Sequence, residues 1–135
     1  RAAESRIVCI PARDEADAIA TRLLVHLLGR LGLAAKALPV SELASECLEG
    51  VRRERPQIAS VSAVPPFGYT HARYLCRRLR EQSAELKVVA GILTERDPAE
   101  LRERQPPIAA DELASSLKQQ LSEIVALMRS ESRPG

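Results

Sequence analysis

Two groups of polar residues have types and spacings that could support chemistry, and the first is acidic. Asp14, Glu15 and Asp17 stand together directly after a short β-rich run. Such carboxylates could hold a cation or a polar ligand. The same spacing also marks a helix start, because an N-cap Asp and an acidic residue three positions later satisfy free backbone N–H groups and face the positive end of the helix dipole. We favour the helix start, with Asp14 as its N-cap.

The second group combines a hydroxyl with an imidazole. Ser62 and His71 could act as nucleophile and base of a small hydrolase. However, Ser62 stands in Val-Ser-Ala, without the Gly-x-Ser-x-Gly turn that exposes the nucleophile of α/β-hydrolases. His71 is expected in the first turn of a helix, near solvent. We therefore favour a ligand-sensing role for Ser62, Tyr69 and His71 over catalysis, and expect no enzyme activity.

The composition disfavours several other kinds of site. The cysteines Cys9, Cys47 and Cys76 are far apart and only two histidines are present, so no metal site is expected. Neither a Gly-x-Gly-x-x-Gly nor a Walker-type loop occurs, which disfavours nucleotide cofactors whose phosphates are bound by such loops. The net charge is +2 and aromatic residues make up 2%. The arginine-rich segments 52–55 and 73–80 are therefore interpreted as solvated faces and no nucleic-acid partner is expected, while contact with anionic lipid or an acidic partner stays open.

Short β-rich runs alternate with helical patterns along the chain, and this alternation predicts the fold class. It is typical of a three-layer, doubly wound α/β fold, here with a parallel sheet of about five strands covered by helices on both faces. The expected strands are residues 5–10, 33–38, 57–64, 86–93 and, more weakly, 107–110. The expected helices are residues 14–31, 41–55 (capped by Ser41), 70–82, a short one opening at 97–101, and 111–128. We expect one domain over residues 1–130 and a disordered tail at 131–135.

The predicted topology also indicates where a ligand would bind. In open α/β sheets, ligands bind beyond the carboxyl ends of the strands, where the strand order reverses. The loops that meet there are residues 12–15, 62–70 and 91–97. The candidate ligand-binding residues on and beside these loops are Arg13, Asp14, Asp17, Ser62, Tyr69, His71 and Gly91.

The first predicted helix carries more apolar residues than one narrow stripe can hold. One explanation is burial under the sheet combined with a subunit contact, and the other is that neighbouring elements wrap the helix. We expect a homodimer contact at Leu24, Val25 and Leu28, although the last helix could serve equally.

Three of these positions form a pattern that resembles the cobalamin-binding domain family. That family has a flavodoxin-like fold with strand order 2-1-3-4-5. Its first loop carries Asp-x-His-x-x-Gly, in which the His ligates cobalt. Ser-x-Leu at the end of its third strand and Gly-Gly at the end of its fourth cradle the nucleotide tail of the cofactor. Asp14, Ser62 and Gly91 match the first residue of each motif.

Other positions of the same motifs differ from the family. Ala16 stands in place of the His, and Ile19 and Ile92 stand in place of glycines. Ala offers no lone pair to a metal, and a branched side chain blocks the close backbone approach that Gly allows. The resemblance therefore implies the fold of this family without cobalt ligation, and we expect no bound cofactor.

A second resemblance covers most of the chain. Residues 67–80, with 14–16 and the leucine-rich helix after them, are similar to the soluble C-terminal domain of proteobacterial permeases of the autoinducer-2 exporter family. This resemblance implies a cytoplasmic domain joined to a transmembrane permease domain of the same chain, in the inner membrane. The start at Arg1 and the polar end of the sequence suit a piece of a longer protein.

Taken together, the residues favour a non-catalytic regulatory or ligand-sensing domain that binds a small molecule and dimerises. A cobalamin or other small-cofactor domain is the alternative within the same fold. A small hydrolase that uses Ser62 and His71 is the alternative from another class.

Overall fold

The computed structural model describes residues 6–66, 68–94 and 97–132. Its strands are β1 (Ile7–Pro11), β2 (Ala35–Ala37), β3 (Ile58–Ala63), β4 (Lys87–Ile92) and β5 (Glu112–Ala114). Its helices are α1 (Glu15–Arg30), α2 (Ala44–Glu54), α3 (Gly68–Gln82), α4 (Pro98–Glu103) and α5 (Leu117–Ser132). The strands form one five-stranded sheet in the order β2-β1-β3-β4-β5, and every neighbouring pair is parallel. The predicted fold class and strand order are confirmed.

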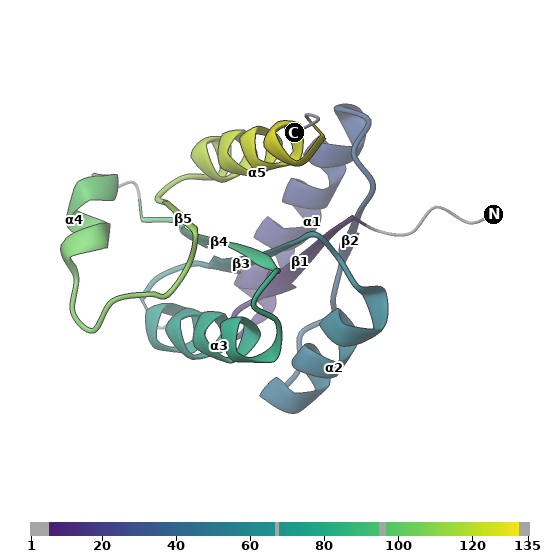
Figure 1. Ribbon diagram of the computed structural model, residues 1–135. Helices are drawn as coiled ribbons and strands as arrows, with labels where there is room; N and C mark the ends of the chain where they lie inside the picture. Colours follow the sequence, from purple (N-terminus) through teal and green to yellow (C-terminus); the bar gives the residue numbers. More distant parts are fainter. Residues whose placement is uncertain (1–5, 67, 95–96, 133–135) are drawn as a thin grey trace.

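Helices cover both faces of the sheet (Figure 1). α1 and α5 pack together on one face, whereas α2 and α3 lie on the other, and α4 packs beside β5. Because all strands run in the same direction, their carboxyl ends and the loops that lead into the helices lie at one edge of the sheet.

The central strands explain why the sheet forms. β1 and β3 are buried along their whole length, as expected for parallel strands covered on both faces. The helix that follows β1 begins as predicted. Asp14 Oδ1 accepts the N–H of Asp17 at 3.2 Å, and Asp17 Oδ2 accepts the N–H of Asp14 at 3.1 Å. This reciprocal capping box fixes the start of α1.

Alternate strand residues contribute to two apolar cores, one on each face of the sheet. The core beneath α2 and α3 includes Val8, Ile10, Val61, Leu75, Leu79 and Val88. The core beneath α1 and α5 includes Ile7, Leu24, Leu28, Ile58, Val89, Ile124 and Met128. Full burial of one such side chain contributes about 1.5–3 kcal/mol, so these cores supply the main drive for folding.

Two of the three residues predicted for a dimer contact on α1 are covered by the domain itself. Leu24 and Leu28 are fully buried against the sheet, and Val25 packs on the same core. Their spacing is that of the stripe by which a helix faces its own domain, so Leu24 and Leu28 are not available to a second copy. A dimer contact at the half-buried Val25 stays a prediction. The large apolar residues that α1 exposes are Ile19 and Leu23.

The predicted fifth strand and last helix are also displaced. β5 lies at Glu112–Ala114 rather than at 107–110, and α5 begins at Leu117, later than predicted. Leu113 precedes Leu117 by four positions, so it matches the helical stripe although it is a strand residue. The start of α5 is set by Ser116, whose Oγ accepts the N–H three residues later at 3.1 Å.

Smaller differences concern the start of α2 and the end of α5. α2 begins at Ala44, with Leu43 as its N-cap residue and no side-chain cap. The predicted cap, Ser41, instead accepts the N–H of Leu43 at 3.2 Å in the turn before the helix. α5 continues to Ser132, into the predicted tail, and the remainder of that tail lies outside the described residues.

Within the described ranges, none of the helices has the length and apolar content that crossing a membrane requires.

Candidate functional site

The predicted ligand-binding residues lie at or near the carboxyl edge of the sheet, but they do not surround one cavity. They divide into a buried group, a cavity-lining group and an exposed group: Asp17, Ser62 and Gly91; Tyr69 and His71; and Arg13 and Asp14.

Asp17 ties together the two loops that meet at the reversal of strand order. Its side chain is inside the protein, and the residue is 1% exposed. Oδ2 accepts the N–H groups of Arg13 at 2.8 Å and Asp14 at 3.1 Å, while Oδ1 accepts the N–H of Val64 at 2.6 Å. The carboxylate therefore binds backbone N–H groups of the loops after β1 and β3, groups that could otherwise face a ligand. The sequence predicted the cap but not the bond to Val64.

Gln120 of α5 fills the space over the ends of β3 and β4. It is fully buried, and its Nε2 donates to Ser60 Oγ at 2.7 Å and Ser62 Oγ at 2.8 Å. Its Oε1 is the one buried side-chain polar atom among the described residues that lacks a hydrogen-bond partner, an arrangement that costs about 1–3 kcal/mol. A Cβ placed on Gly91 would lie 2.3 Å from this Oε1, so the close packing requires glycine there.

The sequence carries a signal for Gln120 that the prediction missed. Position 120 lies three residues after Leu117 and four before Ile124, so it falls on the inner stripe of α5. A single Gln among leucines and isoleucines on that stripe must be buried with polar partners. Those partners are the small polar residues at alternate positions of β3, Ser60 and Ser62.

The interior beneath α1 and α5 is thus divided along the strands. Toward the amino ends it is apolar, with Ile7 and Ile58 fully buried. Toward the carboxyl ends it is polar, with Ser62, Gln120 and Thr21 buried, the last donating to the carbonyl of Asp17 at 2.7 Å. Side chains of the chain itself thus fill the polar interior at the carboxyl edge.

These contacts test whether the residues fit cobalamin, as the family resemblance suggests. Ala16 is exposed on α1 and presents a methyl group where the family has its cobalt ligand. Ser62 and Gly91, which match the tail-cradling motifs, are covered by Gln120. The residues do not fit a cobalamin bound with its nucleotide tail inserted on this side of the sheet.

A cavity of about 380 Å³ opens at the same edge on the other side of the sheet, between α2 and α3. The end of β1 contributes Pro11 and Ala12 to it, and α3 contributes His71. The remaining lining residues come from the loop after β2, from α2 and from α3: Pro39, Ser41, Glu42, Leu43, Ala44, Cys47, Thr70, Arg73, Tyr74, Leu75 and Arg77.

The charged groups of this cavity are mainly basic. Arg73 and Arg77 lie one helical turn apart on α3, beside His71, and Glu42 is the acidic lining residue. The Arg77 guanidinium lies 5.3 Å from the centre of the Tyr74 ring, close enough for a cation–π contact. This contact holds the guanidinium along the helix surface at the cavity wall.

The structure does not bring together the residues of the hydrolase alternative. Ser62 points toward α5, where its Oγ accepts from Gln120, while His71 is exposed on α3 across the sheet. Cys47, the thiol in the His71 cavity, is a poor nucleophile at neutral pH, because burial raises its pKa to about 11.

Tyr69 lines a different cavity of about 680 Å³, which also includes Val64, Leu93 and residues of α4. Its hydroxyl donates to the carbonyl of Pro106 at 2.8 Å, and the Arg104 guanidinium lies 3.7 Å from its ring centre. Burial raises the pKa of Tyr69, although Arg104 partly offsets this. Both contacts attach the segment after α4 to α3, so Tyr69 has a structural task.

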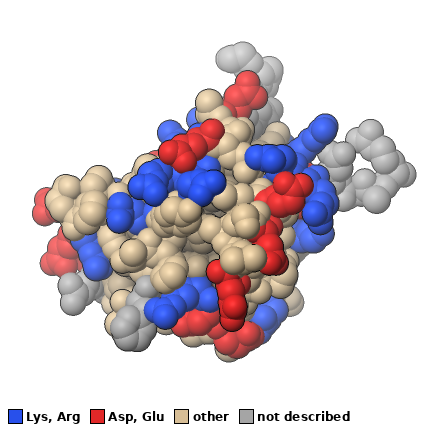
Figure 2. Space-filling model, turned by 90° about the horizontal axis from the view of Figure 1, so that it is seen from below, with Lys and Arg blue, Asp and Glu red and all other residues tan. Residues whose placement is uncertain are grey.

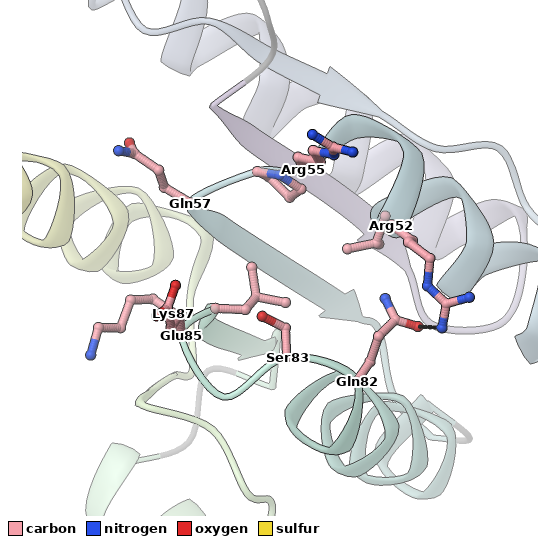
Figure 3. Close-up of a pocket in the computed structure, with 10 residues that line it drawn as sticks. Arg52, Arg55, Gln57, Gln82, Ser83, Glu85 and Lys87 are labelled. Carbon is pink, nitrogen blue, oxygen red and sulfur yellow. Dashed lines mark hydrogen bonds between the residues drawn. The ribbon is translucent and has the colours of Figure 1, made fainter.

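A further cavity of about 730 Å³ lies at the opposite, amino edge of the sheet, between the C-terminal ends of α2 and α3 (Figure 3). Arg52 Nη2 donates to Gln82 Oε1 at 3.4 Å, and Gln82 donates to the carbonyl of Leu48 at 3.1 Å. Helix C-terminal ends carry partial negative charge, which Arg52 and Arg55 offset. These arginines thus complement the helix ends, and an anion would be repelled by the same carbonyl groups.

A metal site is not indicated by the side chains. Within residues 6–66, 68–94 and 97–132, no group of three or more His, Cys, Asp or Glu side chains is placed to hold a metal ion.

Comparison with known proteins identifies solved structures of similar fold. No family model matches the sequence, and no curated protein matches it. A solved cobalamin-binding protein from Desulfitobacterium hafniense is similar with a TM-score of 0.72 and 15% identity, over 91% of this chain and 58% of that one. For the monomethylamine corrinoid protein of Methanosarcina barkeri the TM-score is 0.69 at 20% identity, over 90% and 57%. For a LuxR-family response regulator from Aurantimonas sp. it is 0.61 at 14% identity, over 92% and 85%.

At these identities the similarity shows the fold alone. The chain spans 57–58% of the length of the two cobalamin-related chains. The resemblance to cobalamin-binding domains is confirmed at the level of fold, and no comparison addresses a relation to permeases. The chain has the flavodoxin-like α/β fold that solved cobalamin-binding proteins and response regulators also have.

Proposed function

We propose that this chain is a non-catalytic ligand-sensing domain whose ligand is a small organic anion, bound in the cavity between α2 and α3. The observation that carries the proposal is the placement of His71, Arg73 and Arg77 around a cavity at the carboxyl edge of the sheet. Ligands of this fold class bind at that edge, and arginines are the side chains best suited to carboxylates and phosphates.

The start of α2 supports an anionic ligand. α2 has no side-chain cap at Leu43, and Leu43 and Ala44 both line the cavity. The first N–H groups of a helix carry partial positive charge and favour a nearby anion. Glu46 in the same turn opposes this effect but is exposed to solvent, so its charge is well screened.

The surface favours a small ligand over a polyanion. Seen from the side of α2 and α3, Lys and Arg groups are interspersed with Asp and Glu groups around an uncharged centre (Figure 2). A nucleic acid needs an extended positive surface, which this face does not provide. A cavity of about 380 Å³ is within the range of small-molecule sites.

Packing suggests which element responds to the ligand. The start of α3 is tightly packed, since a Cβ on Gly68 would lie 2.6 Å from that of Ala63. The adjoining loop is held by the bond from Val64 to Asp17. α2 packs on β1 and α3, whereas α3 packs on both β3 and β4. We therefore expect α2 and the loop before it to close on the ligand while α3 stays in place.

The wider role follows from the sequence resemblance of residues 67–80. We propose that the domain regulates a membrane permease to which it is joined, on the cytoplasmic side. Dimerisation stays part of this proposal without an assigned surface. The complete reading frame provides the test, because several hydrophobic spans before Arg1 support the proposal and a frame without them contradicts it.

Calorimetric titration with citrate, succinate and inorganic phosphate tests the ligand class. Replacing both arginines, R73Q/R77Q, should weaken binding at least about tenfold, because each charged hydrogen bond contributes roughly 1.5–3 kcal/mol. R22Q on the exposed surface of α1 is the matched control and should bind as the native chain does. Failure of the native chain to bind any of the three anions, or equal weakening in R22Q, would exclude this site.

Cobalamin carriage is the second candidate, since two structural neighbours are cobalamin or corrinoid proteins. A visible absorbance change with hydroxocobalamin that survives gel filtration would favour it. The absence of His at position 16 and the buried Gln120 predict that no such complex forms.

A further inference from the structure

The amino edge of the sheet, opposite to the proposed ligand cavity, carries positive charge that carboxylates do not offset. This edge is made of the segments that lead into the strands and of the C-terminal ends of α1, α2, α3 and α5. Within the described residues, the cationic side chains there that form no ion pair are Arg6, Arg30, Arg53, Arg55 and Lys87. We call these residues the basic edge, and all but the half-buried Lys87 are exposed.

The carboxylates at this edge are largely engaged with other cations. Glu85, in the segment before β4, is exposed and has no ion pair within the described part of the chain. The acidic residues with ion pairs are Asp111, Glu54 and Glu81, whose partners are Arg80 at 2.6 Å, Lys36 at 2.7 Å and Arg78 at 3.6 Å. The basic edge therefore exceeds the unpaired carboxylates of the described residues.

The helix ends at this edge weaken the positive potential without cancelling it. Each helix end carries about half a negative charge, so four ends contribute about two, against the five charges of the basic edge. The field of a helix end is confined to its last turn, whereas long cationic side chains carry their charge beyond the backbone. Lys87, for example, extends away from the start of β4 (Figure 3). An anion inside the cavity between the ends of α2 and α3 meets the carbonyl groups, but an anionic surface outside meets the tips of the side chains.

An exposed apolar group accompanies these charges. Leu31, the C-cap residue of α1, is 56% exposed. It borders a cavity of about 220 Å³ that also includes Arg6 and the apolar side chains of Leu33, Val125 and Met128. Cations next to exposed apolar side chains are typical of protein segments that lie in the interface of a membrane.

We propose that the basic edge, together with Leu31, docks on the anionic surface of a phospholipid bilayer. Its charges are spread over α1, α2 and the segments before β1, β3 and β4, so they suit a plane of negative charge better than one small anion. Each Lys or Arg near such a surface increases the affinity roughly fivefold.

The choice of a bilayer over an acidic protein rests on the proposed link to a permease. β1 is the first element of the fold and starts at this edge, so whatever precedes residue 6 joins the domain here. A membrane-spanning segment before it would bring the basic edge to the headgroups. The cavity beside Arg73 and Arg77 lies at the opposite edge, so it would face away from the bilayer and stay accessible to a small anion.

Cosedimentation with vesicles tests the docking surface. The native chain should bind vesicles of phosphatidylserine and phosphatidylcholine, bind vesicles of phosphatidylcholine alone much more weakly, and dissociate at high salt. R30Q/R53Q, which changes two exposed helix residues, should bind the anionic vesicles at least about tenfold more weakly. L31Q should weaken binding a few-fold by removing the apolar contact.

The matched control is R22Q/K118Q, which removes two exposed cations from the middle of α1 and from the start of α5. It should bind the anionic vesicles as the native chain does. If thermal unfolding shows that R30Q/R53Q is disturbed, R53Q alone is measured, and a loss of roughly fivefold is expected.

Three results would overturn the proposal: a native chain that does not bind the anionic vesicles at low salt, equal weakening in the control, or equally tight binding of polyglutamate or duplex DNA that L31Q does not change. The last result would assign the surface to an acidic macromolecule. A reading frame without membrane spans contradicts the permease link, whereas absent vesicle binding contradicts the basic edge, so the two failures are distinguishable.

Discussion

The two sides of the sheet differ most at the carboxyl edge, where both could receive a ligand. Beneath α1 and α5, the side chains of Asp17 and Gln120 form hydrogen bonds with polar groups of the loops and strands. Between α2 and α3, a cavity of about 380 Å³ remains open beside Arg73 and Arg77. Fold topology alone predicts a site at this edge without choosing a side. The buried side chains make the choice, because a ligand on the first side would have to displace them.

The largest loss of stability should follow from a substitution of Gly91. This residue lies on the side of the sheet beneath α1 and α5, which we call the closed side because Asp17 and Gln120 fill it. In G91A, the new Cβ would lie 2.3 Å from Gln120 Oε1, so the carboxamide must leave its place over β3 and β4. We expect a loss of about 3 kcal/mol in the free energy of unfolding, as for overpacking of a rigid core, measured by urea denaturation.

Two variants show whether this loss arises from Gln120. The double variant G91A/Q120A should recover part of the stability lost by G91A, because the collision is then removed. G29A is the matched control: a Cβ on Gly29 meets nothing within 4 Å, and Ala is the better helix former. Equal losses in G29A and G91A would mean that the closed packing is not the cause.

Substitution of Asp17 should give the next largest loss of stability. D17N keeps the shape of the side chain but replaces one carboxylate oxygen by an amide that cannot accept the N–H groups now bound to it. We expect a loss of about 2 kcal/mol in the free energy of unfolding, since a buried donor is left unsatisfied. D14N is the control in the same loop and should be nearly neutral, because Asn caps a helix as well as Asp does. Comparable losses in both variants would show that Asp17 acts only as a cap.

A smaller loss of stability is expected from substitution of Asp111. Its carboxylate lies at the edge of the sheet rather than in the closed interior beneath α1 and α5. Burial alone would raise its pKa, but the N–H of Val88 at 2.7 Å and the Arg80 guanidinium at 2.6 Å outweigh burial and lower it. Since the folded pKa is lowered, the stabilisation exists above the unfolded pKa and is lost as pH falls through the folded one. D111N should lose about 1 kcal/mol near neutral pH.

The pH dependence separates this role from a general packing defect. Chemical denaturation of the native chain and of D111N between neutral and acid pH should give stabilities that converge as the carboxylate of the native chain becomes protonated. A constant difference at every pH would contradict a role for the ionised Asp111.

Some features were predictable because local chemistry and tertiary structure agree. β1 and β3 have apolar runs suited to burial on both faces, and Asp14 with Asp17 marks the start of α1. These signals were sufficient for the two central strands and for the start of α1, whereas the strand order followed from the resemblance to cobalamin-binding domains. The position of β5 was not predictable by the same means, because Leu113 matches the helical spacing of α5 and this edge strand is short.

The closed interior was harder to foresee, since its contacts join residues distant in sequence. Gln120 reaches Ser60 and Ser62, which are 60 and 58 positions away in the sequence. Gln is mostly exposed in proteins, so only its place on the inner stripe of α5 indicates burial, and that place does not identify its partners. The assignment of Leu24 and Leu28 to a dimer contact was wrong for a related reason. Apolar residues at helical spacing identify a buried face without saying whether the domain itself or a second copy covers it.

The most direct test is an ¹⁵N–¹H NMR titration of the native chain with citrate. The structure predicts that amide signals of residues 39–47 and 70–77, around the open cavity, shift with increasing citrate, while those of Ser62 and Gly91 stay unchanged because Gln120 covers them. Shifts at Ser62 and Gly91 with residues 70–77 unaffected would contradict the division into a closed and an open side.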